Sequence, residues 1–207
     1  MPARSITVTR NGNGYKRYED TPTGISPRAL PGTRGTIYVS ASDEHNEKGE
    51  VISDVFTDPP TRKKMMEKRM RKMELARKEL AQIFLPKLEG SPDAEVTLVG
   101  WGSTVNLLRA LCRRLEEEGV RVNFLLIKVV APFLSDETTA ILSRCKRLVM
   151  IEANFTSQMS RLLRMETGIG IKDRILKYDG EPFTASETYD QLNKILASKP
   201  AREAFAR

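Results

Sequence analysis

Hydrophobic residues in the second half of the chain form short continuous runs that alternate with segments of helical length. The apolar runs that predict buried strands are residues 96–101, 122–130, 148–152 and 174–178. The segments that predict helices are residues 104–118, 136–144, 158–166 and 185–198. Continuously apolar strands that alternate with helices are typical of a mostly parallel open sheet covered by helices. The pattern therefore predicts an α/β domain over residues 91–207.

A long helix is predicted upstream of this domain, over residues 61–85, with Thr61 as its N-cap and Pro86 as its end. Its apolar stripe at helical spacing consists of Met66, Met70, Met73, Leu80 and Phe84. Such a stripe needs a surface to cover it. Residues 61–90 are therefore interpreted as a basic amphipathic linking helix.

Residues 1–60 are rich in turn formers and poor in large apolar side chains. Residues 5–10 and 15–18 predict the two strands of a hairpin across an Asn-Gly turn, and residues 36–40 predict a short strand. With so little to bury, the segment is expected to lie on another surface, as the irregular tail of a preceding domain that this chain lacks.

The net charge is +7, and most of it comes from the predicted linking helix. Residues 62–79 contain nine basic and three acidic residues. Such a helix suits either a nucleic acid or an acidic partner protein. No aromatic residue interleaves with these charges, which argues against nucleic acid.

The remaining composition indicates a cytoplasmic protein without a membrane span. No run of 18 apolar residues occurs, and the first ten residues lack the apolar core of a secretory signal. The two cysteines, Cys112 and Cys145, are too few to ligate an iron–sulfur cluster, which usually needs about four thiolates. Reduced cysteines in a cytosolic protein are the expectation.

Candidate ligand-binding residues follow two of the predicted strands. Ligands of open parallel sheets bind beyond the carboxyl ends of the strands, which is where these residues lie. The first group follows the first apolar run and comprises Gly102, Ser103 and Thr104 within the GWGST sequence at 100–104. Free amides at a helix start can hold an anion there. The alternative is a tight strand-to-helix turn in which Ser103 or Thr104 caps the helix.

The second group follows the third apolar run and comprises Glu152, Asn154 and Gln158. This cluster suits a polar ligand or an adjoining subunit. The alternative is local capping, with Asn154 or Thr156 bonding the amides of the next helix.

Two further candidates lie in the first 60 residues. Arg28 stands between two prolines that stiffen its backbone, which suits capture of a carboxylate or phosphate, or of an acidic group on another domain. His45, the single histidine, lies in a polar loop without a nucleophile motif, so that a solvated or interface histidine is favoured over a general base.

Several motifs in a fixed order resemble one family. They are GISPRALPG at 24–32, SDEH at 42–45, MMEKRMRKM at 65–73, GWGST at 100–104 and the Glu152, Asn154, Gln158 pattern. In this order and spacing, from about residue 16 to residue 180, the chain resembles the alpha subunits of 2-oxoacid:ferredoxin oxidoreductases.

The resemblance implies a complex that oxidatively decarboxylates a 2-oxoacid on thiamine diphosphate with Mg²⁺. Electrons pass through iron–sulfur clusters to ferredoxin, and coenzyme A accepts the acyl group. It also implies that the α/β domain is similar to the C-terminal domain of transketolase-like enzymes, which lies at subunit contacts. The implied partners are the front domain of the alpha subunit, the beta subunit and, as an open alternative, a gamma subunit.

The chain departs from the family pattern where the cofactors bind. It lacks the Tyr-Pro-Ile-Thr-Pro and Arg-x-Gly-Pro-Ser-Thr-Gly stretches, the cluster cysteines and the diphosphate–magnesium motif, and Ser157 stands where relatives often have glycine. We therefore expect the C-terminal portion of such an alpha subunit, which serves oligomer assembly and binds no cofactor alone. The alternative is a free-standing flavodoxin-like module that binds a nucleotide or anion at residues 100–104.

Overall fold

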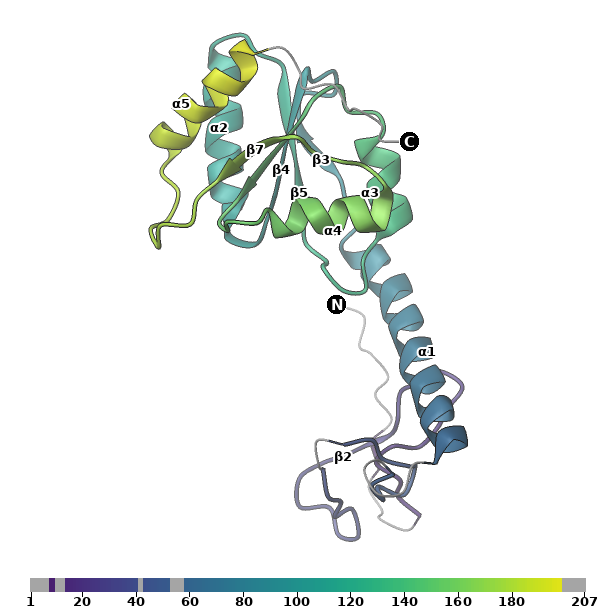
Figure 1. Ribbon diagram of the computed structural model, residues 1–207. Helices are drawn as coiled ribbons and strands as arrows, with labels where there is room; N and C mark the ends of the chain where they lie inside the picture. Colours follow the sequence, from purple (N-terminus) through teal and green to yellow (C-terminus); the bar gives the residue numbers. More distant parts are fainter. Residues whose placement is uncertain (1–7, 10–13, 41–42, 53–57, 199–207) are drawn as a thin grey trace. The chain divides into compact units, whose positions relative to one another are not determined.

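The computed structural model describes residues 8–9, 14–40, 43–52 and 58–198. The chain divides into two compact units, Met1–Glu79 and Leu80–Arg207 (Figure 1). The division falls inside the linking helix and not at residue 90, where the sequence pattern changes.

A five-stranded sheet forms the centre of the second unit. Its strands, in spatial order, are β3 (Leu88–Gly90), β5 (Val122–Ile127), β4 (Val96–Trp101), β6 (Leu148–Glu152) and β7 (Asp173–Leu176). Strands β4 to β7 are parallel, and β3 runs antiparallel to β5 at one edge. The predicted α/β fold with a mostly parallel sheet is confirmed.

Helices cover both faces of this sheet (Figure 1). Helices α2 (Val105–Glu117) and α5 (Ala185–Ala197) pack on one face, and α3 (Ser135–Leu142) and α4 (Gln158–Thr167) pack on the other. Successive residues of β4 lie on opposite faces of the sheet. Leu98 belongs to the core that α2 covers, and Val99 belongs to the core that α4 covers. Because both faces are buried, the central strands β4, β5 and β6 are mostly apolar.

The order of the strands creates a topological switch point. Helix α2 connects β4 to β5 on one side of β4, after which the chain returns to β6 on the other side. The carboxyl ends of β4 and β6 therefore flank the place where ligands bind in open α/β sheets.

The sequence pattern missed one strand and extended another too far. Strand β3 has three residues and is largely exposed, so it leaves no hydrophobic signal. Strand β5 ends at Ile127 although the apolar run continues to Val130, which is 44% exposed. Burial, and not apolar composition alone, decides where the strand ends.

Regular structure is sparse in the first unit. Strand β1 (Val8–Thr9) pairs in parallel with β2 (Arg28–Ala29), so the prediction that it pairs with residues 15–18 in a hairpin is wrong. The Asn-Gly turn at 11–14 lies mostly outside the described residues. The predicted strand at 36–40 is also absent, and Ile37 is 98% exposed, so no buried face supports a strand there.

Helix α1 (Pro59–Ile83) begins two residues before the predicted start. The Asp58 carboxylate accepts the Thr61 amide at 3.2 Å and the Thr61 hydroxyl at 2.7 Å, so Asp58 and not Thr61 caps the helix. Despite its length, α1 is strongly polar. Within the described residues no helix is both long and apolar enough to span a bilayer.

Low burial in the first unit leads to a prediction about local stability. Among its described residues, Met65 is the single buried large hydrophobic side chain, whereas the sheet of the second unit is buried on both faces. We expect amides of residues 14–52 to exchange with solvent much faster than those of β4, β5 and β6 in the isolated chain. Mass spectrometry of exchanged peptides measures this difference. Equal, strong protection in both units of a monomer would contradict it.

Candidate functional site

The GISPRALPG segment touches the backbone of α1 in the first unit. Gly24 has φ +74°, and a Cβ atom built on it would lie 2.3 Å from the Lys68 carbonyl oxygen and 2.8 Å from the Lys72 amide nitrogen. No side chain fits that gap, so only glycine allows this approach. Two sequence motifs, at 24–32 and 65–73, therefore meet at one contact.

The SDEH segment is fixed to the same helix by an ion pair. Arg69 donates to both oxygens of Glu44, at 2.8 and 2.5 Å. The hydrogen bonds from Arg69 hold the pKa of the Glu44 carboxyl below its ordinary value. Further ion pairs between the irregular segment and α1 join Lys64 to Glu47 and Arg71 to Asp20. Three motifs that are far apart in sequence thus converge on one side of α1.

A cavity of about 350 Å³ lies where these motifs meet. The basic residues that line it are Arg17, Arg28, Lys68, Arg69 and Lys72. The acidic residues that line it are Asp43 and Glu44. Because Glu44 is already paired with Arg69, the cavity carries an excess of positive charge.

Aromatic rings support the wall of this cationic cavity. His45 is 4% exposed and stacks on Tyr18, with ring centroids 4.8 Å apart and planes at 15°. The Arg17 guanidinium lies over Tyr18 at 5.4 Å and over Tyr38 at 5.3 Å. These contacts restrict the guanidinium to a narrow range of positions.

Lys68 is the most buried basic residue of the cavity, with 8% exposure. Within the described part of the chain, no hydrogen bond or ion pair reaches its amine. Burial lowers the pKa of Lys68, and the charges of Lys72, Arg17 and Arg69 lower it further, against a smaller opposing effect of Asp20. An amine in such a position favours a bound negative charge.

A second cavity, of about 400 Å³, lies at the carboxyl edge of the sheet in the second unit. It is lined by Ser103 and Thr104 after β4 and by Ala153 after β6. Gly102 forms the turn with φ +59°, and Thr104 donates its hydroxyl to the Trp101 carbonyl at 3.0 Å instead of capping α2. None of the described residues lining this cavity is basic, so an anion has only backbone amides to bind there.

Glu152 is fully buried at the end of β6, and its carboxylate accepts hydrogen bonds from the start of α4. Its oxygens accept the Ser157 hydroxyl at 2.6 Å, the Asn154 amide at 2.8 Å and the Met159 backbone amide at 2.9 Å. The Ser160 amide donates at 3.3 Å. Burial would raise the pKa of Glu152, but these hydrogen bonds outweigh it and hold the pKa below its ordinary value.

The rest of the Glu152 group also bonds locally. Asn154 accepts the Gln158 amide at 3.0 Å, while the Gln158 side chain is exposed. Ser157 adopts the left-handed conformation, with φ 54° and ψ 58°. Its hydroxyl bond to Glu152 offsets part of the strain that a non-glycine residue carries there. The tight turn is therefore present even without glycine.

The structure thus places the sequence candidates at two sites. Arg28 and His45 line the cationic cavity, whereas the GWGST and Glu152 groups follow the adjacent strands β4 and β6. Lys68 was not predictable from the methionine stripe of α1, because it lies outside that stripe. The buried face includes Met65, and Lys68 follows it by three residues, which is the spacing that would have revealed it.

The second unit matches a known protein family. Residues 94–186 match the family model for pyruvate:ferredoxin oxidoreductase core domain II. The solved 2-oxoglutarate:ferredoxin oxidoreductase from Magnetococcus marinus, with 2-oxoglutarate, coenzyme A and succinyl-CoA bound, superposes with a TM-score of 0.70 at 28% identity. That match covers 94% of this chain and 31% of the solved chain.

The particular subunit follows from the curated relatives. The alpha subunit of 2-oxoacid:ferredoxin oxidoreductase 1 from Sulfurisphaera tokodaii is 35% identical over 95% of this chain and 30% of its own length. The corresponding subunit from Aeropyrum pernix is 37% identical over 88% of this chain and 28% of its own length. The chain belongs to the 2-oxoacid:ferredoxin oxidoreductase family and corresponds to part of its alpha subunit. It spans about 30% of the length of these relatives.

Proposed function

We propose that this chain supplies an assembly segment of an alpha subunit, within an enzyme that oxidatively decarboxylates a 2-oxoacid on thiamine diphosphate. Ferredoxin accepts the electrons and coenzyme A accepts the acyl group. The names of the relatives support the 2-oxoacid and ferredoxin, and the solved relative with succinyl-CoA supports the acyl transfer. The partners are the front portion of the alpha subunit and the beta subunit.

The residues of this chain do not fit the cofactors of that reaction. Thiamine diphosphate needs a metal for its diphosphate, and no group of three or more His, Cys, Asp or Glu side chains that could hold a metal occurs among the described residues. The sequence has two cysteines, fewer than the four thiolates of a usual cluster. Burial raises the pKa of the Cys112 thiol to about 12, which opposes the thiolate that ligation requires. We therefore assign no catalytic step to these residues.

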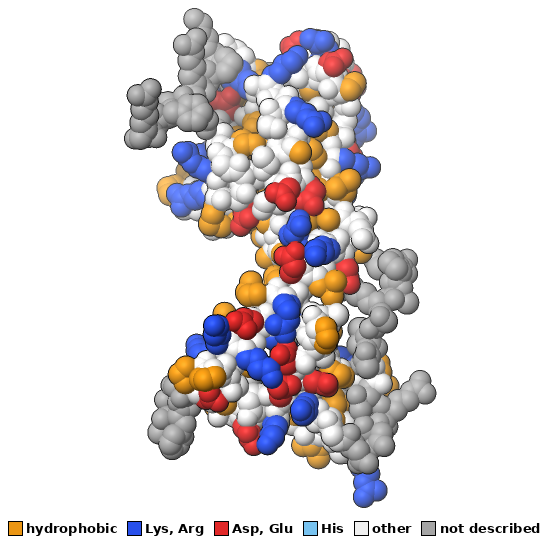
Figure 2. Space-filling view, turned by 90° about the vertical axis from the view of Figure 1, so that its right-hand side faces the viewer, with side chains coloured by type: hydrophobic (Ala, Val, Ile, Leu, Met, Phe, Trp, Pro, Cys, Tyr) orange, Lys and Arg blue, Asp and Glu red, His pale blue; other side chains and the backbone are white. Residues whose placement is uncertain are grey.

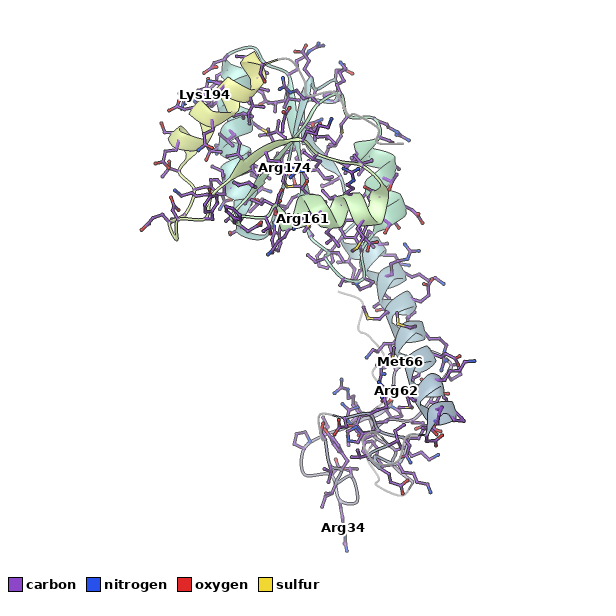
Figure 3. The ribbon with its side chains drawn as sticks, in the orientation of Figure 1. Arg34, Arg62, Met66, Arg161, Arg174 and Lys194 are labelled. Atoms are coloured by element: carbon purple, nitrogen blue, oxygen red, sulfur yellow. The ribbon has the colours of Figure 1, made fainter. Side chains whose placement is uncertain are left out.

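The observation that carries the proposal is the exposure of large apolar side chains in the first unit. Ile37 is 98% exposed, Val39 71% and Leu30 60%. Met66 projects from α1 (Figure 3), and with Met70 and Pro22 it lines an open groove of about 700 Å³. Hydrophobic side chains also reach the surface on the face of this unit that is seen at the bottom of Figure 2. Apolar surface of this extent is typical of a protein interface.

Reconstitution tests the proposed function. The chain is mixed with the front portion of the alpha subunit and the beta subunit, and 2-oxoacid-dependent reduction of ferredoxin is measured. We expect activity only in the complete mixture. Oxidation of 2-oxoacids by the isolated chain, or full activity of the mixture without it, would contradict the proposal.

A substitution on α1 tests whether the exposed methionines form the interface. Met70 is 58% exposed in this chain, and burial of a methionine side chain contributes about 1.5–3 kcal/mol. Met70→Asp is expected to weaken subunit binding by roughly 10- to 100-fold, as measured by calorimetric titration. The matched control is Lys63→Gln, because the Lys63 side chain is 80% exposed. Lys64 is a poorer control, because its amine donates to the Glu47 carboxylate at 2.7 Å. Equal effects of the two substitutions would exclude this interface.

A further inference from the structure

The cationic cavity of the first unit has more positive charge than its own residues neutralise. Arg69 is neutralised by Glu44, whereas no hydrogen bond or ion pair joins Arg28, Lys68 or Lys72 to a described residue. The Asp20 carboxylate acts on Lys68 by its charge, but it is paired with Arg71 and Lys64. Asp43 is the one other carboxylate in the lining. Like charges gathered in a small volume repel each other unless an anion lies among them.

Lys68 indicates where such an anion would bind. A lysine with 8% exposure is rarely found without a partner for its charge. Burial and the neighbouring cations lower its pKa more than Asp20 raises it, and a bound anion would offset the repulsion from those cations. The surrounding protein thus holds a cation in a position that an oxyanion would stabilise.

The groups around Lys68 are held in place before any ligand binds. The GISPRALPG backbone is fixed against α1 at Gly24, and SDEH is fixed by the Glu44 ion pair. Arg17 rests on Tyr18 and Tyr38. Guanidinium groups with restricted positions suit carboxylate and phosphate, because they bind two oxygens at once.

We infer that this cavity is a binding site for a small multivalent oxyanion, a phosphoryl or dicarboxylate ligand held by Lys68, Arg28 and Arg17. Its volume of about 350 Å³ lies at the lower end of small-molecule sites and suits a compact ligand. The site is inferred from the first unit alone and does not depend on the proposed function.

Titration calorimetry of the full chain with pyrophosphate and with succinate, at constant ionic strength, tests the site. We expect saturable binding of at least one anion, and a loss of affinity of about tenfold or more in Lys68→Met. Pyrophosphate binding alone would assign a phosphoryl ligand, and succinate binding alone would assign a dicarboxylate. The matched control is Lys63→Met, which removes the same charge from an exposed position on α1.

A second variant separates binding from folding. Arg28 is exposed, so Arg28→Gln is expected to leave the thermal unfolding temperature unchanged. The same substitution is expected to weaken binding of the anion that Lys68→Met affects. Equal loss in Lys68→Met and Lys63→Met would show non-specific attraction and overturn the site. Absence of saturable binding of both anions to the unsubstituted chain would overturn it as well.

Discussion

Replacing Gly24 with alanine is expected to separate the GISPRALPG segment from α1. The new Cβ would lie 2.3 Å from the Lys68 carbonyl oxygen, and a backbone atom cannot move aside as a flexible side chain can. Left-handed strain and overpacking together should cost about 2–5 kcal/mol. Hydrogen exchange measures the effect as faster exchange across residues 14–52.

Gly32 provides a matched control within the same motif. Its φ of +85° imposes similar strain on alanine, but no atom lies within 4 Å of the added Cβ. Gly32→Ala should therefore cost only about 1–2 kcal/mol. Equal effects of Gly24→Ala and Gly32→Ala would mean that backbone strain, and not the contact with α1, explains the glycine at position 24.

The second unit should lose substantial stability when Glu152 is replaced with glutamine. The carboxylate accepts hydrogen bonds on both oxygens, and an amide nitrogen in place of one oxygen would face donors. Each buried donor left without an acceptor costs about 1–3 kcal/mol. Urea denaturation followed by the fluorescence of Trp101, the single tryptophan, measures this loss. Glu117→Gln, on the exposed side of α2, is the control.

The same carboxylate predicts how stability depends on pH. Its pKa is lowered in the folded chain, so its contribution is present above the unfolded pKa of about 4.3 and is lost as the pH falls toward the folded pKa. Glu152→Gln should reduce this acid-dependent loss. An unchanged acid profile would show that Glu152 is not ionised in the folded chain.

The fold of the second unit was predictable because its central strands β4, β5 and β6 bury both faces. The runs at 96–101 and 148–152 coincide with β4 and β6, since nearly all residues of both strands are buried. Strand β3 escaped prediction because pairing with β5, and not hydrophobic pattern, makes it a strand. Long-range pairing leaves no local signal.

The site was only partly predictable, because contacts across sequence assemble it. Arg28 and His45 were recognisable from local context, and both line the cationic cavity. Lys68 was not recognisable in this way, because nothing local distinguishes it from the other lysines of the basic helix. Its burial depends on the segment that packs against α1. The methionine stripe drew attention to Met66 and Met70, while the face that packs within this chain contains Met65. An apolar stripe does not reveal which surface covers it.

The continuity of α1 determines how the chain can be divided in the laboratory. The compact units meet between Glu79 and Leu80, inside a helix that extends to Ile83. A recombinant fragment that starts at Leu80 would remove the carbonyl acceptors of the last helical turn and expose its amides. A cleaner fragment of the sheet unit begins at Pro86, and the first unit is best expressed through Ile83. A protease site introduced after Leu85 should release both pieces with their secondary structure intact.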